Sequence, residues 1–157
     1  MPTIESSITI QALPAQLFVL SQHYGLRLEW DPFVRELRFL EGATQPEVGV
    51  KVWVRARNGL GMEAEYITVK PPDTVAIKMT RGPRFFSRFS GSWTFHALGA
   101  GVTEVIFRYH FAVRPTVLAW AIEPVLGRVF LRDIRARLEA LKHHAEHTDI
   151  LTRLGPQ

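Results

Sequence analysis

The C-terminal part of the sequence contains two histidines at the spacing of a zinc site. His143, Glu146 and His147 spell H-x-x-E-H, which puts two imidazoles on one helical face with a carboxylate beside them, as in inverted zinc proteases. Such a site needs a further protein ligand downstream, and none of the ten residues after His147 is a glutamate. We therefore interpret the motif as a solvated helix end that interacts with the helix dipole, and we expect no metal and no cofactor.

A second group of residues alternates arginine with phenylalanine. Its members are Arg81, Arg84, Phe85, Phe86, Arg88 and Phe89. Together they could grip an anionic headgroup or a single-stranded nucleic acid by charge and stacking, although most such clusters are only solvated surface. If a cavity opens at this hairpin, the arginines could instead select an acidic ligand tail. We expect no nucleic-acid partner, because the arginines are scattered along the chain rather than massed in one run.

Other catalytic motifs are missing. His96 and His110 alternate with apolar strand residues, so we expect them on the outer face of a sheet as surface residues. There is no G-x-S-x-G elbow, Walker loop or dinucleotide fingerprint, and Gly59 and Gly61 lie in a predicted hairpin rather than between a strand and a helix. We assign no catalytic residue.

Composition indicates one ordinary globular domain. The 157 residues are 46% hydrophobic and 22% charged, with a formal charge of +4 and no cysteine, which excludes disulfides and thiolate zinc sites. We expect a single domain over residues 1–147, a tail over residues 148–157, and a cytoplasmic location. Residues 1–11 lack the pattern of a signal peptide, and charges interrupt the apolar stretch 111–131, so we predict no transmembrane segment.

Hydrophobic periodicity predicts the elements that position these residues. A period of two over residues 3–11 predicts a strand, and Pro14 then begins a short helix. In the fragment at residues 29–37 we expect a second short helix or turn, with Asp31 as its cap and Pro32 at its first position. Six further strands are predicted over residues 34–40, 48–56, 62–69, 74–80, 85–97 and 102–113.

The last predicted element is a long amphipathic helix over residues 116–147. Pro124 and Gly127 should kink it or split off its first turns, because proline removes a backbone donor. The fold class is therefore α+β, with a seven-stranded curved antiparallel sheet around a long C-terminal helix and two short helices after the first strand.

This order of elements resembles the SRPBCC superfamily, which includes START domains, polyketide cyclases and dehydratases, and the major birch pollen allergen. The resemblance covers residues 3–147 and includes the aspartate–proline pair after Trp30 and the W-x-F pair at Trp93 and Phe95. It implies a helix-grip fold with a deep cavity between sheet and helix, which commonly holds a lipid, sterol, polyketide or other apolar ligand. Fold alone does not fix function. The chain has no metal-binding cluster of the kind that marks a Rieske oxygenase.

The side chains on the covered face are the candidates for contact with a ligand, although core packing is the alternative for each of them. Tyr66, Tyr109 and Trp93 are the sharper candidates, because a buried hydroxyl or indole needs a partner that a ligand oxygen or a main-chain carbonyl could supply. The predicted ligand-binding residues are Met62, Tyr66, Met79, Phe89, Trp93, Phe107, Tyr109, Phe111, Ile122, Leu126 and Phe130.

Three functions are consistent with this pattern. The first is non-catalytic binding or transport of a hydrophobic or amphipathic small molecule, lipid-like or polyketide-like. The second is a cyclase-like or dehydratase-like enzyme, in which Tyr66, Tyr109 or Asp133 acts as acid or base. The third is an interaction module in which Trp53 on the outer face, or Trp120 near the helix start, contacts a partner or a second copy in a homodimer. Peripheral membrane contact stays open.

Overall fold

The structure is a computed structural model that describes residues 2–155. Its strands are β1 (Thr3–Ile10), β2 (Val34–Phe39), β3 (Lys51–Ala56), β4 (Gly61–Lys70), β5 (Thr74–Arg81), β6 (Phe86–Gly99) and β7 (Val102–Val113). Its helices are α1 (Pro14–Gln22), α2 (Tyr24–Trp30), the 3₁₀ turn η1 (Thr116–Leu118), α3 (Ala119–His147) and α4 (Ile150–Arg153). Within the described part, no helix has both the length and the apolar character needed to cross a membrane.

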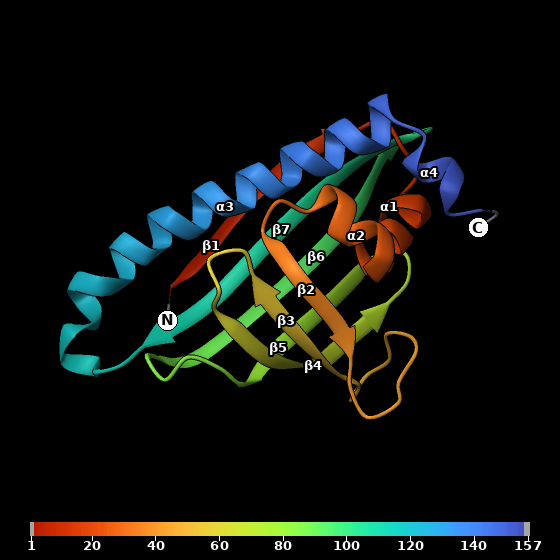
Figure 1. Cartoon of the computed structure of the whole chain (residues 1–157). Coiled ribbons are helices and arrows are strands. Elements are labelled where there is room, and N and C mark those ends of the chain that lie inside the picture. The colour runs from red at the N-terminus through yellow and green to blue at the C-terminus, as the bar shows by residue number, and fades with distance from the viewer. Residues whose placement is uncertain (1, 156–157) are drawn as a thin grey trace.

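The strands form one antiparallel sheet in the order β1-β7-β6-β5-β4-β3-β2. Each strand from β2 to β6 pairs with the next strand in sequence, and β1 forms the other edge by pairing with β7. Figure 1 shows the sheet curving beneath α3, with α1 and α2 at the end where β1 leaves the sheet. This is the predicted α+β helix-grip architecture, and the seven strands and the two short helices after β1 are confirmed.

The clearest sequence pattern corresponds to the clearest structural pattern. Every second residue of β7, from Thr103 to Val113, is buried, while the residues between them are half-buried on the outer face. Because strand side chains alternate between faces, this places Phe107, Tyr109 and Phe111 under the helix. The predicted alternation over residues 102–113 is confirmed.

Helix α3 packs mainly against β1 and β7 and runs along the covered face of the sheet (Figure 1). Ile134, Leu138 and Leu141 form its fully buried stripe. The helix is continuous through Pro124, so its first turns are not split off. These turns are the least buried part of α3, since Trp120 is 79% exposed.

The position of the second helix differs from the prediction. Helix α2 precedes Asp31 instead of starting there, and Asp31 lies just beyond its C-terminal end with extended backbone (φ −83°, ψ 111°). Pro32 explains the difference, because the residue before a proline is sterically excluded from the helical region. The Asp31 side chain accepts a hydrogen bond from the backbone N–H of Phe33 (2.9 Å) and so shapes the turn into β2.

The segment after α3, which we predicted as a tail, contains the short helix α4. Ile150 is buried against the core, and Arg153 forms an ion pair with Glu29 of α2 (2.9 Å). These contacts hold the described end of the chain beside α2.

Candidate functional site

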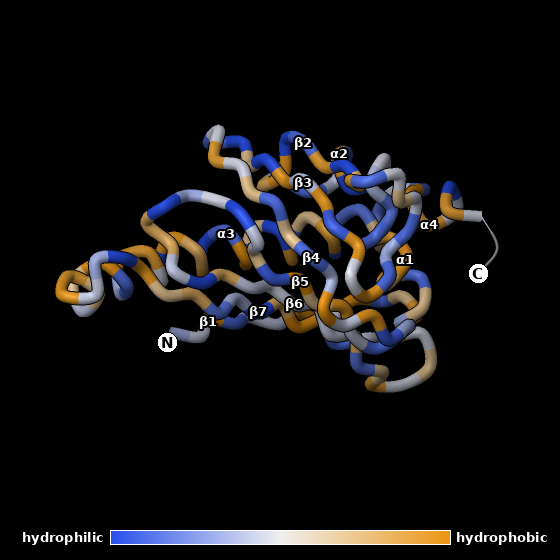
Figure 2. Tube along the Cα trace, turned by 90° about the horizontal axis from the view of Figure 1, so that it is seen from below, coloured by the Kyte–Doolittle hydropathy of each residue, from blue (hydrophilic) through white to orange (hydrophobic). Residues whose placement is uncertain are grey.

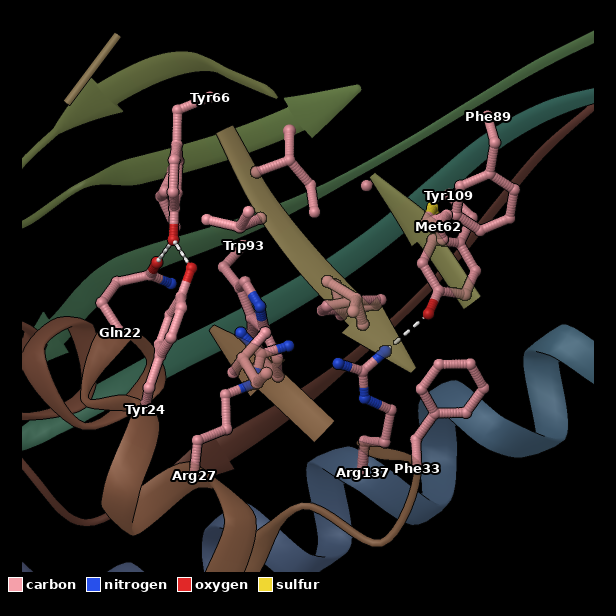
Figure 3. A pocket seen from close by; sticks show the side chains of 17 residues that line it. Gln22, Tyr24, Arg27, Phe33, Met62, Tyr66, Phe89, Trp93, Tyr109 and Arg137 are labelled. Carbon is pink, nitrogen blue, oxygen red and sulfur yellow. Dashed lines mark hydrogen bonds between the residues drawn. The ribbon is translucent and has the colours of Figure 1, made fainter. Parts of the chain in front are cut away.

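A pocket lies between the sheet and the helices, at the place where β2 to β7 face α2 and α3 (Figure 3). We call it the inner pocket, and it contains about 600 Å³ of space between atoms, including space open to solvent. Its walls are Gln22, Tyr24, Arg27, Phe33, Leu37, Val52, Val54, Met62, Tyr66, Val75, Ile77, Phe89, Gly91, Trp93, Phe107, Tyr109 and Arg137.

A buried ion-pair cluster forms one side of the inner pocket. Arg137 of α3 donates to Asp31 Oδ2 from Nε (3.2 Å) and from Nη2 (3.0 Å). Arg27 of α2 donates from Nε to the same oxygen (3.2 Å). The side chains of Asp31 and Arg137 are only 0% and 3% exposed, so the pair is removed from water. Because buried charges must be paired, this cluster fixes α3 against the end of α2.

Aromatic rings surround the cluster. The Arg137 guanidinium lies 4.5 Å from the ring centre of Phe107, 4.8 Å from that of Phe33 and 5.7 Å from that of Trp93. Its Nη1 also donates to the Tyr109 hydroxyl (2.5 Å). Guanidinium groups stack well on aromatic faces, so these rings hold the charge in place without neutralising it.

A second polar group lies on the other side of the pocket. Tyr66 donates to Gln22 Oε1 (2.7 Å), and the hydroxyls of Tyr24 and Tyr66 are 2.6 Å apart (Figure 3). Because the Tyr66 proton is used toward Gln22, Tyr24 is the donor between the two hydroxyls. Tyr24 also stacks on Phe39, with ring centres 4.3 Å apart. We call Gln22, Tyr24 and Tyr66 the tyrosine relay.

Burial and charge set the protonation of these groups. Burial would raise the pKa of Asp31, but the adjacent Arg137 and Arg27 outweigh it and hold that pKa below its usual value. Burial raises the pKa of Tyr24, Tyr66 and Tyr109, so all three phenols are neutral near pH 7. The pocket therefore contains neutral hydroxyls beside a charged cluster.

A second cavity, the outer pocket, adjoins the inner one and contains about 700 Å³ of space, again including open solvent. Phe33, Val54, Met62 and Phe89 line both. The outer pocket lies between the β3–β4 turn, the β5–β6 turn and α3, and its rim includes the exposed side chains of Leu60, Phe85 and Val129. Its wall is mostly apolar, with Asp133 as a carboxylate at the helix side.

The predicted ligand-binding residues fall into three groups in the structure. The inner pocket is lined by Met62, Tyr66, Phe89, Trp93, Phe107 and Tyr109. The outer pocket is lined by Met62, Phe89, Leu126 and Phe130. Met79, Phe111 and Ile122 line neither pocket: Phe111 is fully buried against Phe86 and Phe130, and the other two pack at the edge of the core.

Sequence analysis missed the polar residues that distinguish this pocket. Arg137 lies three residues after Ile134 and four before Leu141, so its place in the apolar stripe of α3 was the available signal. Arg27 and Tyr24 gave no signal, because α2 is too short to show a periodic pattern. Asp31 was noticed, but as a helix cap.

The histidine motifs and Trp53 line neither pocket. Glu146 accepts hydrogen bonds from the Gln11 backbone (2.8 Å) and from Lys142 (3.2 Å), and no cluster of metal ligands occurs among residues 2–155. His110 lies beside Thr3 on the outer face (2.8 Å). Trp53 is half-buried between Arg38 and Arg55, whose guanidinium carbons lie 5.9 and 5.4 Å from the centre of its ring.

At the end where α3 begins, apolar residues are exposed to solvent, and Figure 2 shows hydrophobic colouring there. Val117 and Trp120 are 76% and 79% exposed, and Val125 is 59% exposed. This exposed group lies close in sequence to Leu126 and Val129, which line the outer pocket.

Comparison with solved structures shows the same fold in proteins of low sequence identity. A START superfamily protein from Mycobacterium smegmatis has a TM-score of 0.77 at 11% identity, over 92% of this chain and 97% of that one. An aromatase/cyclase from Streptomyces sp. R1128 has a TM-score of 0.70 at 17% identity, over 93% and 96%. The di-domain aromatase/cyclase BexL has a TM-score of 0.76 at 15% identity, over 93% of this chain and 47% of BexL.

Among curated proteins, no sequence matches this chain. A family model does match it, over residues 1–146, and that model describes polyketide cyclases, dehydrases and lipid transport proteins. The match spans β1 to α3 and so includes both pockets. The chain therefore belongs to the polyketide cyclase/dehydrase and lipid transport family.

Proposed function

We propose that this protein binds a hydrophobic or amphipathic small molecule, lipid-like or polyketide-like, in the joined inner and outer pockets. The observation that carries the proposal is the mostly apolar lining of two adjoining pockets, which share four residues, with a small set of polar side chains in the inner one. A mostly apolar pocket with a few convergent polar groups is the usual form of a small-molecule site. Membership in a family that includes lipid transport proteins supports the same reading.

A neutral fluorophore tests the proposal. N-phenyl-1-naphthylamine should gain fluorescence on binding the purified protein, because its emission increases in an apolar site. Val54→Phe should weaken this binding, since Val54 lines both pockets and the larger ring occupies their junction. Val48→Phe is the matched control, because Val48 is 67% exposed in the loop before β3 and lines neither pocket.

Solvent extraction of the purified protein followed by mass spectrometry is the second arm. We expect an apolar molecule to co-purify with the wild type and to be reduced in Val54→Phe. If neither extraction nor the fluorophore detects binding, or if both Val→Phe variants bind as the wild type does, the proposal is wrong.

A cyclase-like or dehydratase-like reaction in the same pockets is the second candidate. The observation in its favour is that Tyr66, Tyr109 and Asp133 all line the two pockets. Neutral phenols with raised pKa values can donate a proton but are weak bases near pH 7. Asp133 is then the better base, and burial also raises its pKa against the opposing charges of Arg132 and Arg137.

The two candidates give different results with Asp133→Asn. In an enzyme, this variant should still bind the fluorophore but lose turnover of a poly-β-ketone substrate. In a carrier, the wild type shows no turnover and the variant binds as before.

An interaction surface is the third candidate, and the exposed Trp120 is the observation in its favour. Trp53 is less suited to this role, because Arg38 and Arg55 already cover it. Light scattering of the wild type and of Trp120→Ala tests self-association: a dimer that the substitution abolishes supports this candidate, and a monomer in both excludes a homodimer through Trp120.

A further inference from the structure

The inner pocket contains more positive than negative charge. Arg27 and Arg137 both line it, whereas Asp31, the carboxylate that pairs with them, lies behind them and is fully buried. Within residues 2–155, no carboxylate lines the inner pocket, so the two guanidiniums and the buried Asp31 behind them leave a net charge of +1. Asp133 lies in the outer pocket and acts on Arg137 only through space.

Asp31 already accepts four hydrogen bonds, three of them from the two arginines. Its Oδ2 accepts from Arg27 Nε and from Nε and Nη2 of Arg137, and its Oδ1 accepts from the Phe33 backbone. Arg27 uses Nη1 toward the Ser21 carbonyl (3.2 Å). In the described part of the chain, the Arg27 Nη2 group has no acceptor, although it belongs to a side chain that lines the pocket.

Tyr109 adds a further donor on this side. Its hydroxyl oxygen accepts from Arg137 Nη1, which leaves the phenol proton free to donate, and none of the described residues accepts it. The tyrosine relay differs, because its protons are already used: Tyr24 donates to Tyr66, Tyr66 to Gln22, and Gln22 to Ser21. The spare donors are therefore concentrated beside the surplus positive charge.

We propose that the bound molecule is anionic, and that its charged group lies against Arg27, Arg137 and Tyr109 while its apolar body extends into the outer pocket. A delocalised anion with two oxygens fits these donors, which means a carboxylate or the enolate of a β-dicarbonyl. The Trp93 and Phe107 rings lie beside the Arg137 guanidinium, and their low polarity strengthens the attraction. This inference rests on the proposed function and names the class of ligand that the same pocket takes.

Displacement of N-phenyl-1-naphthylamine by matched twelve-carbon competitors tests the charge requirement. We expect dodecanoate to displace the fluorophore at a concentration about tenfold lower than 1-dodecanol, because a charged hydrogen bond adds roughly this factor. Methyl dodecanoate should behave like the alcohol, and dodecylammonium should be the weakest competitor. A 2-acyl-1,3-cyclohexanedione, which ionises to an enolate, serves as a further competitor. If it displaces the fluorophore at a lower concentration than dodecanoate, the pocket prefers an enolate to a carboxylate.

Variants at Arg27 locate the effect. Arg27→Gln should remove most of the preference for dodecanoate over dodecanol, and Arg27→Lys should retain that preference. Arg128→Gln is the control, because Arg128 is exposed on α3 and lines neither pocket. Urea unfolding of each variant verifies that it is folded.

The outcomes separate the two proposals. If the fluorophore binds and dodecanol competes as well as dodecanoate, the anion inference is overturned and the proposed function stands. The same holds if Arg27→Gln keeps the full preference. If no probe binds and extraction yields no apolar molecule, both the proposed function and this inference are wrong.

Discussion

Arg137 and Asp31 are 106 residues apart in sequence, and two hydrogen bonds join them inside the pocket wall. The pair links the middle of α3 to the turn between α2 and β2, so it fixes the helix over the sheet. Arg27 binds the same carboxylate, so the cluster contains two cations around one anion and has a net charge of +1.

This charge count predicts an unequal cost of neutralising the members of the cluster. Asp31→Asn leaves two unpaired guanidiniums in the interior and should lower the free energy of unfolding by about 3 kcal/mol or more. Arg137→Gln leaves Asp31 paired with Arg27 and should cost less. Urea unfolding at neutral pH measures both values.

The double variant and a surface variant complete this experiment. Asp31→Asn combined with Arg137→Gln leaves Arg27 as the single charge of the cluster. The double variant should therefore lose less free energy of unfolding than the sum of the losses of the single variants. Arg153→Gln, which breaks the exposed ion pair with Glu29, should leave the urea midpoint almost unchanged. Additive costs, or equal costs for the two buried variants, would contradict the charge count.

The same cluster predicts how the stability of the fold depends on pH. The pKa of Asp31 is lower in the folded protein than in the unfolded chain, so its contribution is complete above the unfolded value of about 3.9 and is lost as pH falls through the folded value. The wild type should lose urea resistance below about pH 4. Asp31→Asn should lack this component, whereas Glu29→Gln, at an exposed site, should retain it. Parallel pH profiles for the wild type and Asp31→Asn would exclude the assignment.

A periodic pattern of apolar residues shows which face of a strand or helix is buried, so it predicts the elements of a fold and how they pack. The period of two along β7 and the apolar stripe of α3 predicted the sheet, the helix and the faces that meet, because burial acts on every second strand residue and on every third or fourth helix residue. The alternation along β4 and β7 also predicted Tyr66 and Tyr109 on the covered face, where both line the inner pocket.

The polar centre of the pocket could not be predicted in the same way. The three partners of Asp31 are the local Arg27 and Phe33 and the distant Arg137, and no local pattern reports a contact across 106 residues. An aspartate before a proline is equally suited to capping a helix and to ending one, and here the steric effect of Pro32 on the preceding residue decides. The exposure of the first turns of α3 could not be predicted either, because Trp120 is a large apolar residue and yet is exposed.

The three tyrosines of the chain predict an unusual alkaline titration. Tyr24, Tyr66 and Tyr109 all line the inner pocket, and burial raises the pKa of each. Because these pKa values are higher in the folded protein, their contribution to stability is complete below about pH 10 and is lost as pH rises above it. Tyrosinate absorbance should therefore appear only together with loss of the circular dichroism of the folded protein. A tyrosine that ionises reversibly near its ordinary pKa in the folded protein would show that the pocket is open to water.

Gly91 offers the sharpest test of the pocket wall. It faces Tyr109 across the β6–β7 pairing, and a Cβ at this position would lie 3.1 and 3.2 Å from Cε1 and Cδ1 of the tyrosine ring. Gly91→Ala should displace that ring and disturb its hydrogen bond with Arg137, so we expect a stability loss of about 1–3 kcal/mol and weaker displacement of the fluorophore by dodecanoate.

A second glycine of the same strand provides the control for that prediction. A Cβ at Gly99 would meet nothing within 4 Å, so Gly99→Ala should keep both the urea midpoint and the binding of the wild type. The comparison isolates the crowding of Tyr109 from the general effect of alanine in β6. If Gly91→Ala binds dodecanoate as well as Gly99→Ala does, the Tyr109 ring can move without consequence, and its hydroxyl does not position the anion.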